Sequence, residues 1–223
     1  MNSALAARLK KACRWAVIVI LCLGYPLLSH LFASSAVPSL AGALVAMAPL
    51  STLALALAWR STGRTAMLAL CLAGFVLLYL YGSWLVAHYN WVFLLDHAGI
   101  NALLCVAFGR TLARGRDPMI SQFARIVHGD LTPALVSYTR AATWAWVFYF
   151  GAVAVVSLLL FWQASPQVWS VFANLLGLPL LALMFAGEYA VRCQVLSATE
   201  RAGPLESIRA YRQASLRSTA RLP

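Results

Sequence analysis

Residues 141–162 read AATWAWVFYFGAVAVVSLLLFW and contain no charged side chain. A helix needs about 20 apolar residues to cross the hydrocarbon core of a bilayer. Asp96 is the only Asp, Glu, Lys or Arg within this stretch and five other apolar stretches, at 15–32, 37–59, 66–87, 91–108 and 168–187. The sequence therefore predicts an all-α fold, a polytopic bundle of about six membrane-spanning helices arranged as three hairpins.

The composition of the whole chain points the same way. Its 223 residues are 62% hydrophobic and only 10% charged, with a mean hydropathy of +0.79. A soluble domain is typically about 25% charged, so these values exclude a soluble globular protein. We expect a six-span membrane domain over residues 1–192 and a basic cytoplasmic tail over residues 193–223.

The basic residues predict the orientation of the spans. All 17 Lys and Arg residues lie before the first span, after the last, or in alternate connections, and the connections 33–36, 88–90 and 163–167 hold none. Lys and Arg near span ends are retained in the cytoplasm, so both termini should be cytoplasmic.

The net charge of +11 then lies along a cytoplasmic surface of the protein, where anionic lipid headgroups attract it. We expect membrane lipids as partners, and no nucleic acid.

The first span has a second interpretation. Basic residues before it, and Ser34, Ser35 and Ala36 after it, resemble a cleaved secretory signal. Its apolar run, 15–32, exceeds the usual 7 to about 15 residues of such signals, which favours a retained span.

In the second span, Ala41, Gly42 and Ala46 offer a small-residue face for self-association.

Asp96 is the candidate functional group at membrane depth. A carboxylate inside the hydrocarbon core is energetically unfavourable, so residues of this kind usually serve a function. A hairpin turning at Tyr89 would place Asp96 about 10 Å below the outer boundary. It would also place Asp96 opposite Gly82 and Ser83, and His97 opposite Tyr81. Two interpretations follow: a site that handles protons or a ligand, or a carboxyl bonded to Ser83 or Tyr81 that joins two helices.

His97, Asn101 and Cys105 follow at spacings of four residues. They form a polar stripe on one helix face that should point into the bundle, where such residues commonly join helices. Asp96, His97 and Asn101 make up the predicted intramembrane polar site. We expect no metal there, because the hairpin would separate His88 from His97 by about 10 Å. We also expect no cofactor.

The connection 109–140 is the most distinctive extramembrane segment. Asp117 and Pro118 signal the start of a short interfacial helix that Gly129 ends. Arginine side chains bind phosphates and carboxylates through paired hydrogen bonds. The sequence therefore predicts a site for an anion or a partner protein formed by Arg110, Arg114, Arg116, Arg125 and Arg140.

Two further pairs stand near this cytoplasmic face. His128, with Asp130 nearby, could act as a general base, although no recognised catalytic motif accompanies the pair. Glu188 and Arg192 are four residues apart, and this order favours an ion pair on a helix. We expect that pair to fix the inner end of the last span.

Several short motifs from this connection onward resemble a known family. They are FGRTL (108–112), DP (117–118), FAR (123–125), HG (128–129), YTR (138–140), TWAW (143–146) and GEYAVR (187–192). Together they resemble a family of uncharacterised bacterial inner-membrane proteins encoded beside clusters for aryl-polyene or xanthomonadin-type pigments. The first hundred residues match only in hydropathy, and no family catalytic residues carry over.

The resemblance implies an inner-membrane location and pathway substrates carried on acidic acyl carrier proteins. The leading hypothesis is an accessory or scaffold component that docks carriers or pathway enzymes through the connection 109–140. The alternatives are a transporter or flippase for a lipidic product that uses Asp96 and His97, and an interfacial acyl or phosphate transferase with His128 as base.

Overall fold

The computed structural model describes residues 3–35 and 37–196. All regular elements of this part of the chain are helices and it contains no β-strand, which confirms the predicted all-α class. Four stretches are long and apolar enough to cross a membrane: Leu40–Arg60, Gly82–Thr111, Pro133–Gln163 and Pro166–Val195. Two shorter apolar helical stretches accompany them, Cys22–Ala33 and Arg64–Leu80.

The chain divides into two compact units. Unit 1 comprises Met1–Gly99 and Val156–Leu178, and unit 2 comprises Ile100–Val155 and Pro179–Pro223. Unit 1 contains α1 (Ser3–Ala33), α2 (Leu40–Arg60), α3 (Arg64–Leu80), α4 (Gly82–Leu94), the π-helical turn η1 (Leu95–Gly99), α8 (Pro166–Ser170) and the π-helical turn η2 (Val171–Leu176). Unit 2 contains α5 (Ile100–Thr111), α6 (Met119–His128) and most of α7 (Pro133–Gln163) and α9 (Gly177–Val195).

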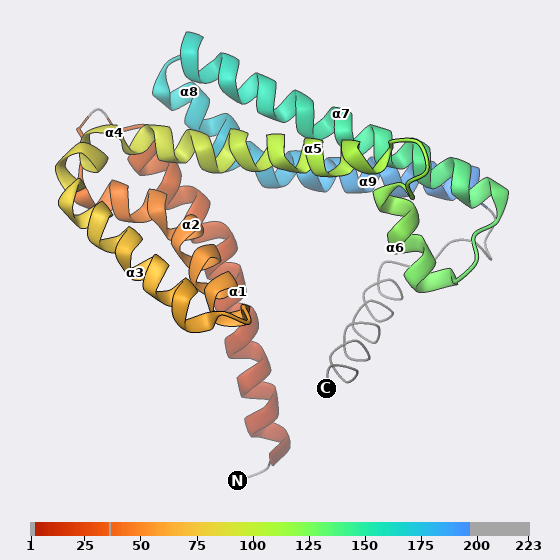
Figure 1. Ribbon diagram of the computed structural model, residues 1–223, viewed down its shortest axis with the longest axis horizontal. Coiled ribbons are helices and arrows are strands. Elements are labelled where there is room, and N and C mark those ends of the chain that lie inside the picture. Colours follow the sequence, from red (N-terminus) through yellow and green to blue (C-terminus); the bar gives the residue numbers. More distant parts are fainter. Residues whose placement is uncertain (1–2, 36, 197–223) are drawn as a thin grey trace. The chain divides into compact units, whose positions relative to one another are not determined.

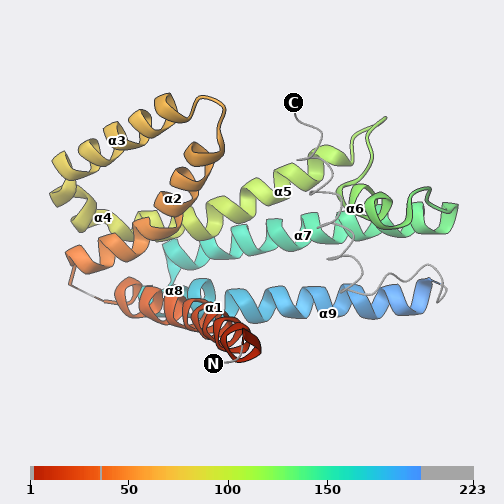
Figure 2. The same cartoon turned by 90° about the horizontal axis from the view of Figure 1, so that it is seen from below.

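In unit 1, α2 lies between α1 and α3 and also contacts α4 (Figures 1 and 2). Ser39 caps α2, its side chain accepting a hydrogen bond from the Gly42 amide at 3.1 Å. Small residues let these helices approach closely. The core combines Ala33, Ala43, Ala46 and Ala98 with Tyr89, Phe93 and Trp169.

Part of the small-residue face on α2 serves this core. Gly42 and Ala46 are buried within unit 1, whereas Ala41 is exposed. The Tyr89 ring lies against Gly42, and its hydroxyl donates a hydrogen bond to the Phe32 carbonyl at 2.9 Å. Gly42 and Ala46 thus already pack within the same chain, and self-association through this face stays a prediction.

The connection predicted at residues 88–90 contains a kink, and a second break lies before it. His88 has non-helical dihedrals where two helical segments of α4 meet, and Tyr81 ends α3 and precedes α4 with dihedrals of φ −98° and ψ 20°. The predicted span 66–87 therefore crosses the break at Tyr81, whereas residues 91–108 follow the kink at His88.

Local contacts stabilise the segment around this kink. His88 has φ −125° and ψ 17°, while its Nδ1 lies 2.9 Å from the Trp84 carbonyl oxygen. The neighbouring Tyr89 is buried in the core of unit 1. The polar residues thus lie at a kink, and the burial of Tyr89 fixes the helix that follows it.

In unit 2, aromatic side chains join α7 to its neighbours. Phe108 of α5 packs on Phe150 at 5.4 Å between ring centroids, and Trp146 packs on Phe185 of α9 at 4.7 Å. Figure 2 shows α5 and α7 side by side. The short helix predicted after Asp117 is present as α6, an amphipathic segment that begins two residues later.

Candidate functional site

The basic connection begins at the end of α5, where Thr111 links two helices. Its Oγ1 donates to the Phe108 carbonyl at 2.6 Å and accepts from the Met119 amide, the first of α6, at 2.9 Å. The side chain therefore satisfies one free amide at the start of α6 in place of an ordinary cap. This contact closes the connection into a compact turn.

Hydroxyl groups also hold α6 against α7. The Ile120 amide donates to Thr143 Oγ1 at 3.2 Å, and Ser121 and Thr139 share a hydrogen bond of 2.7 Å between their hydroxyls. Ser121, Thr139 and Thr143 are all buried. The two threonines belong to the YTR and TWAW motifs, and the contacts give them a structural role that the sequence did not indicate.

The five candidate arginines fall into two groups. Arg125 pairs with Asp117 at 3.0 Å, and Arg140 donates to the Leu112 carbonyl at 3.1 Å. Arg110, Arg114 and Arg116 are exposed and form no ion pair within the described part of the chain.

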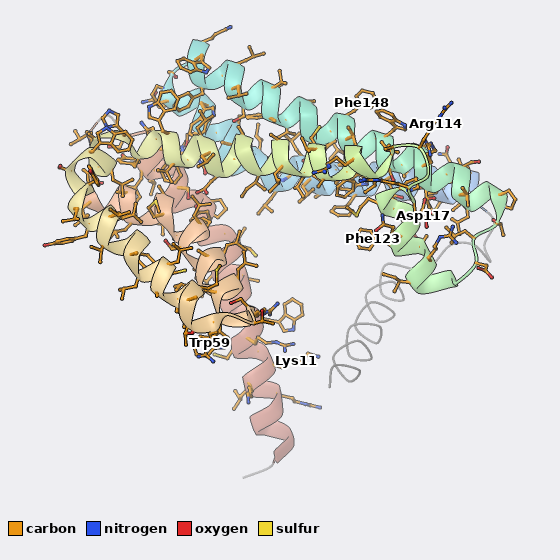
Figure 3. All side chains as sticks on the ribbon, viewed as in Figure 1. Lys11, Trp59, Arg114, Asp117, Phe123 and Phe148 are labelled. Carbon is orange, nitrogen blue, oxygen red and sulfur yellow. The ribbon has the colours of Figure 1, made fainter. Side chains whose placement is uncertain are left out.

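These three arginines, which we call the basic turn, surround a constrained backbone. Gly115 lies between two of them at φ +77°, a left-handed conformation that glycine adopts readily. Figure 3 shows Arg114 and Asp117 on this connection, with Phe123 on the adjoining α6. The structure therefore separates arginines that stabilise the connection from arginines that are exposed on it.

The candidate general base is only partly described. His128 is the last residue of α6, and the backbone ends that helix at Gly129 with φ +72°. The His128 side chain lies outside the described residues, and Asp130 is exposed. The His128 and Asp130 pairing stays a prediction.

Glu188 and Arg192 form an ion pair on α9 at 2.8 Å. The Tyr138 hydroxyl of α7 donates to the same Glu188 carboxylate, a partner that sequence reasoning missed. Beside this cluster runs a groove of about 830 Å³ between α7 and α9, lined almost entirely by apolar side chains such as Ala145 and Leu183. Tyr138 thereby joins α7 to α9, since Tyr138 and Glu188 are 50 residues apart in the chain.

Within the membrane-spanning part of unit 1, polar side chains form two hydrogen-bonded groups. In the first, His97 Nδ1 and Ser157 Oγ are 3.0 Å apart, and Trp169 Nε1 donates to the same Ser157 oxygen at 3.1 Å. Ser157 is fully buried. It ties the π-helical turn η1 to α7 and α8.

The second group joins α1 to α8 and η2. His30 Nδ1 lies 2.9 Å from Ser170 Oγ, and Asn174 Nδ2 donates to that oxygen at 3.0 Å. Sequence reasoning missed Ser157, Ser170 and Asn174, although each is a polar residue within an apolar stretch. Both groups involve a π-helical turn, η1 or η2, and such turns frequently occur at functional sites.

Asp96 lies beside His97 in η1, but its surroundings differ from the prediction. Both carboxylate oxygens are buried and make no hydrogen bond within the described part of the chain. Neither Ser83 nor Tyr81 bonds the carboxylate, so the expected hydrogen bond from Asp96 to one of them is wrong.

The remaining residue of the predicted polar site is Asn101. It lies one helical turn after His97 at the start of α5, in unit 2. Cys105, the next residue of the stripe, packs beside Gly151 of α7. Among the described residues, no three His, Cys, Asp or Glu side chains are grouped closely enough to hold a metal ion.

Two arrangements thus stand out: the exposed basic turn and the buried Asp96 carboxylate. The family resemblance of the motifs between residues 108 and 192 stays a prediction. Comparison with protein-family models, curated proteins and solved structures finds no match to this chain.

Proposed function

We propose that the chain is a six-span protein of the bacterial inner membrane with both termini in the cytoplasm. The four long apolar helices and the two shorter apolar stretches together supply six candidate spans. The distribution of all 17 basic residues supports the orientation. In this arrangement the basic turn and α6 lie at the cytoplasmic surface.

We further propose that the protein is an accessory scaffold that docks an acidic acyl carrier protein, or an enzyme carrying it, at the membrane. One observation carries this proposal: Arg110, Arg114 and Arg116 are exposed and lack acidic partners in the described residues, whereas Arg125 and Arg140 are engaged within the connection. The resemblance to proteins of aryl-polyene clusters supplies the class of partner.

The architecture of the connection suits such docking. Thr111, Thr139 and Thr143 hold α6 and the turn in place before any partner arrives, so little ordering cost accompanies binding. Complementary charge accelerates encounter more than it strengthens the final complex. The expected interaction is therefore rapid, reversible and sensitive to salt.

Capture of a purified acyl carrier protein tests this proposal. The full chain is immobilised in mild detergent, and carrier retention is measured at low and high salt. Retention should fall strongly in the triple variant Arg110→Gln, Arg114→Gln, Arg116→Gln, because the exposed positive charge is removed without touching the threonine contacts. A matched control removes equal charge elsewhere, in Arg8→Gln, Lys10→Gln, Lys11→Gln, and should retain the carrier.

Equal retention by the wild-type chain and the basic-turn variant would exclude the scaffold proposal. Equal loss in both triple variants would show attraction by net charge alone, with no specific site. The two variants therefore separate docking at the basic turn from general electrostatic attraction.

A second candidate function is transport of a lipidic product through the bundle. Its support is the Asp96 carboxylate, buried without hydrogen bonds inside the long apolar stretch Gly82–Thr111. Intramembrane carboxylates commonly mark substrate or ion pathways.

In cells that make the product, Asp96→Asn should abolish export without lowering the protein level. Asp130→Asn, the same change at an exposed site, should leave export unchanged. Normal export by the Asp96 variant would remove this candidate.

A further inference from the structure

The groove between α7 and α9 has the size of a ligand site. Its volume of about 830 Å³ falls within the roughly 300–1,000 Å³ of small-molecule pockets, and all of its lining residues belong to unit 2. Small residues keep it open, since Ala141 and Ala145 of α7 line it together with Gly187 of α9. A Cβ atom added at Gly187 would meet nothing within 4 Å. The described side chains therefore leave room here for a ligand.

The groove covers the depth of one membrane leaflet. Its lining on α7 runs from Ser137 to Tyr149, a length of about 18 Å at 1.5 Å per residue. Half of the hydrocarbon core of a bilayer is about 15 Å thick, and the whole core about 30 Å. A helix of a second copy would follow α7 and α9 across the whole core. The length of the groove therefore suits the acyl chains of one lipid better than a partner helix.

A polar cluster lies beside the groove where the start of α7 meets the end of α9 (Figure 2). Glu188 Oε1 accepts hydrogen bonds from the Tyr138 hydroxyl, from Arg192 Nη2 at 2.8 Å and from Arg192 Nε at 3.2 Å. The other carboxylate oxygen, Oε2, makes no hydrogen bond within the described part of the chain. Arginine has five N–H donors, so Arg192 keeps donors beyond the two that bind Glu188. An acceptor and donors of opposite charge are thus available next to an apolar groove.

The charges of this cluster select the head group of a lipid. Glu188 and Arg192 form an ion pair, so together they carry no net charge that would favour an anionic head. A head with one phosphate and one ammonium group matches both residues. The guanidinium donates to the phosphate, and the carboxylate accepts from the ammonium, in charge-assisted hydrogen bonds.

We infer that this groove binds one zwitterionic glycerophospholipid. An acyl chain lies along Ala145 and Gly187, the phosphate is at Arg192, and the ammonium group is at Glu188. Binding requires only that α7 and α9 lie in a membrane, so it does not depend on carrier docking at the basic turn. Its assignment to the cytoplasmic leaflet rests on the orientation proposed above.

Lipid titration of the full chain in detergent, followed by native mass spectrometry, tests the site. One molecule of phosphatidylethanolamine should be retained, and phosphatidylglycerol with the same acyl chains should be retained more weakly. Gly187→Leu fills the groove and should lose most of this retention. Gly74→Leu, the same change at a helical glycine of α3 that also has nothing within 4 Å of an added Cβ, should retain the lipid.

Glu188→Gln tests the head group separately. It keeps an oxygen for Tyr138 and Arg192 but removes the negative charge that binds the ammonium group. The preference for phosphatidylethanolamine over phosphatidylglycerol should therefore fall, because Arg192 is left with a net positive charge. A residue that served only to join α7 to α9 would not change this preference.

Three results would overturn the inference. Equal retention of the two lipids by the wild-type chain would exclude a zwitterionic lipid, and equal retention by the wild-type chain and Gly187→Leu would place the lipid elsewhere. A changed oligomeric state in Gly187→Leu with unchanged lipid retention would show that a second copy occupies the groove. Should Gly187→Leu fail to fold, Ala145→Leu fills the groove from α7 instead.

The scaffold proposal fails separately. Carrier capture by Gly187→Leu should equal that of the wild-type chain, because the groove contains no residue of the basic turn. Lipid retention without carrier capture by the wild-type chain would remove the scaffold and leave the lipid site, and the reverse result would do the opposite.

Discussion

Among the glycines of unit 1, Gly42 leaves the least room for a Cβ atom. A Cβ atom there would lie 2.8 Å from Cζ of the Tyr89 ring and 3.2 Å from Ser39 Oγ. The Tyr89 ring is buried and its hydroxyl is bonded to the Phe32 carbonyl, so the ring cannot move without losing that bond. The contact between α2 and α4 therefore depends on glycine at this residue.

Gly42→Ala should destabilise the protein by about 1–3 kcal/mol, the usual cost of overpacking a core. Thermal unfolding in detergent measures the change. Gly74→Ala on α3 is the control, since nothing lies within 4 Å of a Cβ there, and alanine is favoured over glycine in a helix by roughly 0.5–1 kcal/mol. Equal Tm values for the two variants would contradict the close contact with Tyr89.

Several of these residue contacts could not be predicted from the sequence. Asp96 and the arginines could be selected from it, because charge in an apolar stretch or in a connection is visible in the sequence itself. The partners of the arginines could not be selected, since Asp117 and the Leu112 carbonyl become partners of Arg125 and Arg140 only through folding. The sequence likewise could not show that Arg125 and Arg140 are occupied while the basic turn is exposed.

At the scale of elements, side-chain hydroxyls bond α6 to α7 beside the apolar packing of Ile120. Thr143 Oγ1 accepts from the Ile120 amide and donates to the Thr139 carbonyl, and it is fully buried. Removing this hydroxyl leaves a buried amide at the start of α6 without an acceptor. Loss of this hydrogen bond should destabilise α6 more than the other helices.

Thr143→Val should therefore loosen α6 by about 1–3 kcal/mol, the cost of an unsatisfied buried polar group. Hydrogen exchange followed by mass spectrometry should show faster exchange in residues 119–128 and little change in α2. Ser137→Ala, an exposed position on the same helix, provides the comparison. Unchanged exchange in α6 would mean that its apolar face, and not Thr143, holds it.

At the scale of the whole molecule, the prediction concerns orientation in the membrane. In a chain whose native cysteines are replaced, Gln163→Cys should react with a membrane-impermeant maleimide added to spheroplasts. Arg116→Cys should react only after the membrane is permeabilised. The reason is that all basic residues lie in the connections that we assign to the cytoplasm, while residues 163–167 hold none. Labelling in the opposite order would invert the topology and move the basic turn away from any cytoplasmic carrier.

The amino-acid sequence alone determined that this protein is helical and belongs in a membrane, because apolar stretches and the placement of charge are properties of composition along the chain. Tertiary structure decided where the helices break and what their polar residues contact. It added a break at Tyr81 to the kink at His88, and it buried Tyr89, which follows that kink, against Gly42. It also left Asp96 buried and without hydrogen bonds in the described part of the chain, a consequence of packing between segments far apart in sequence.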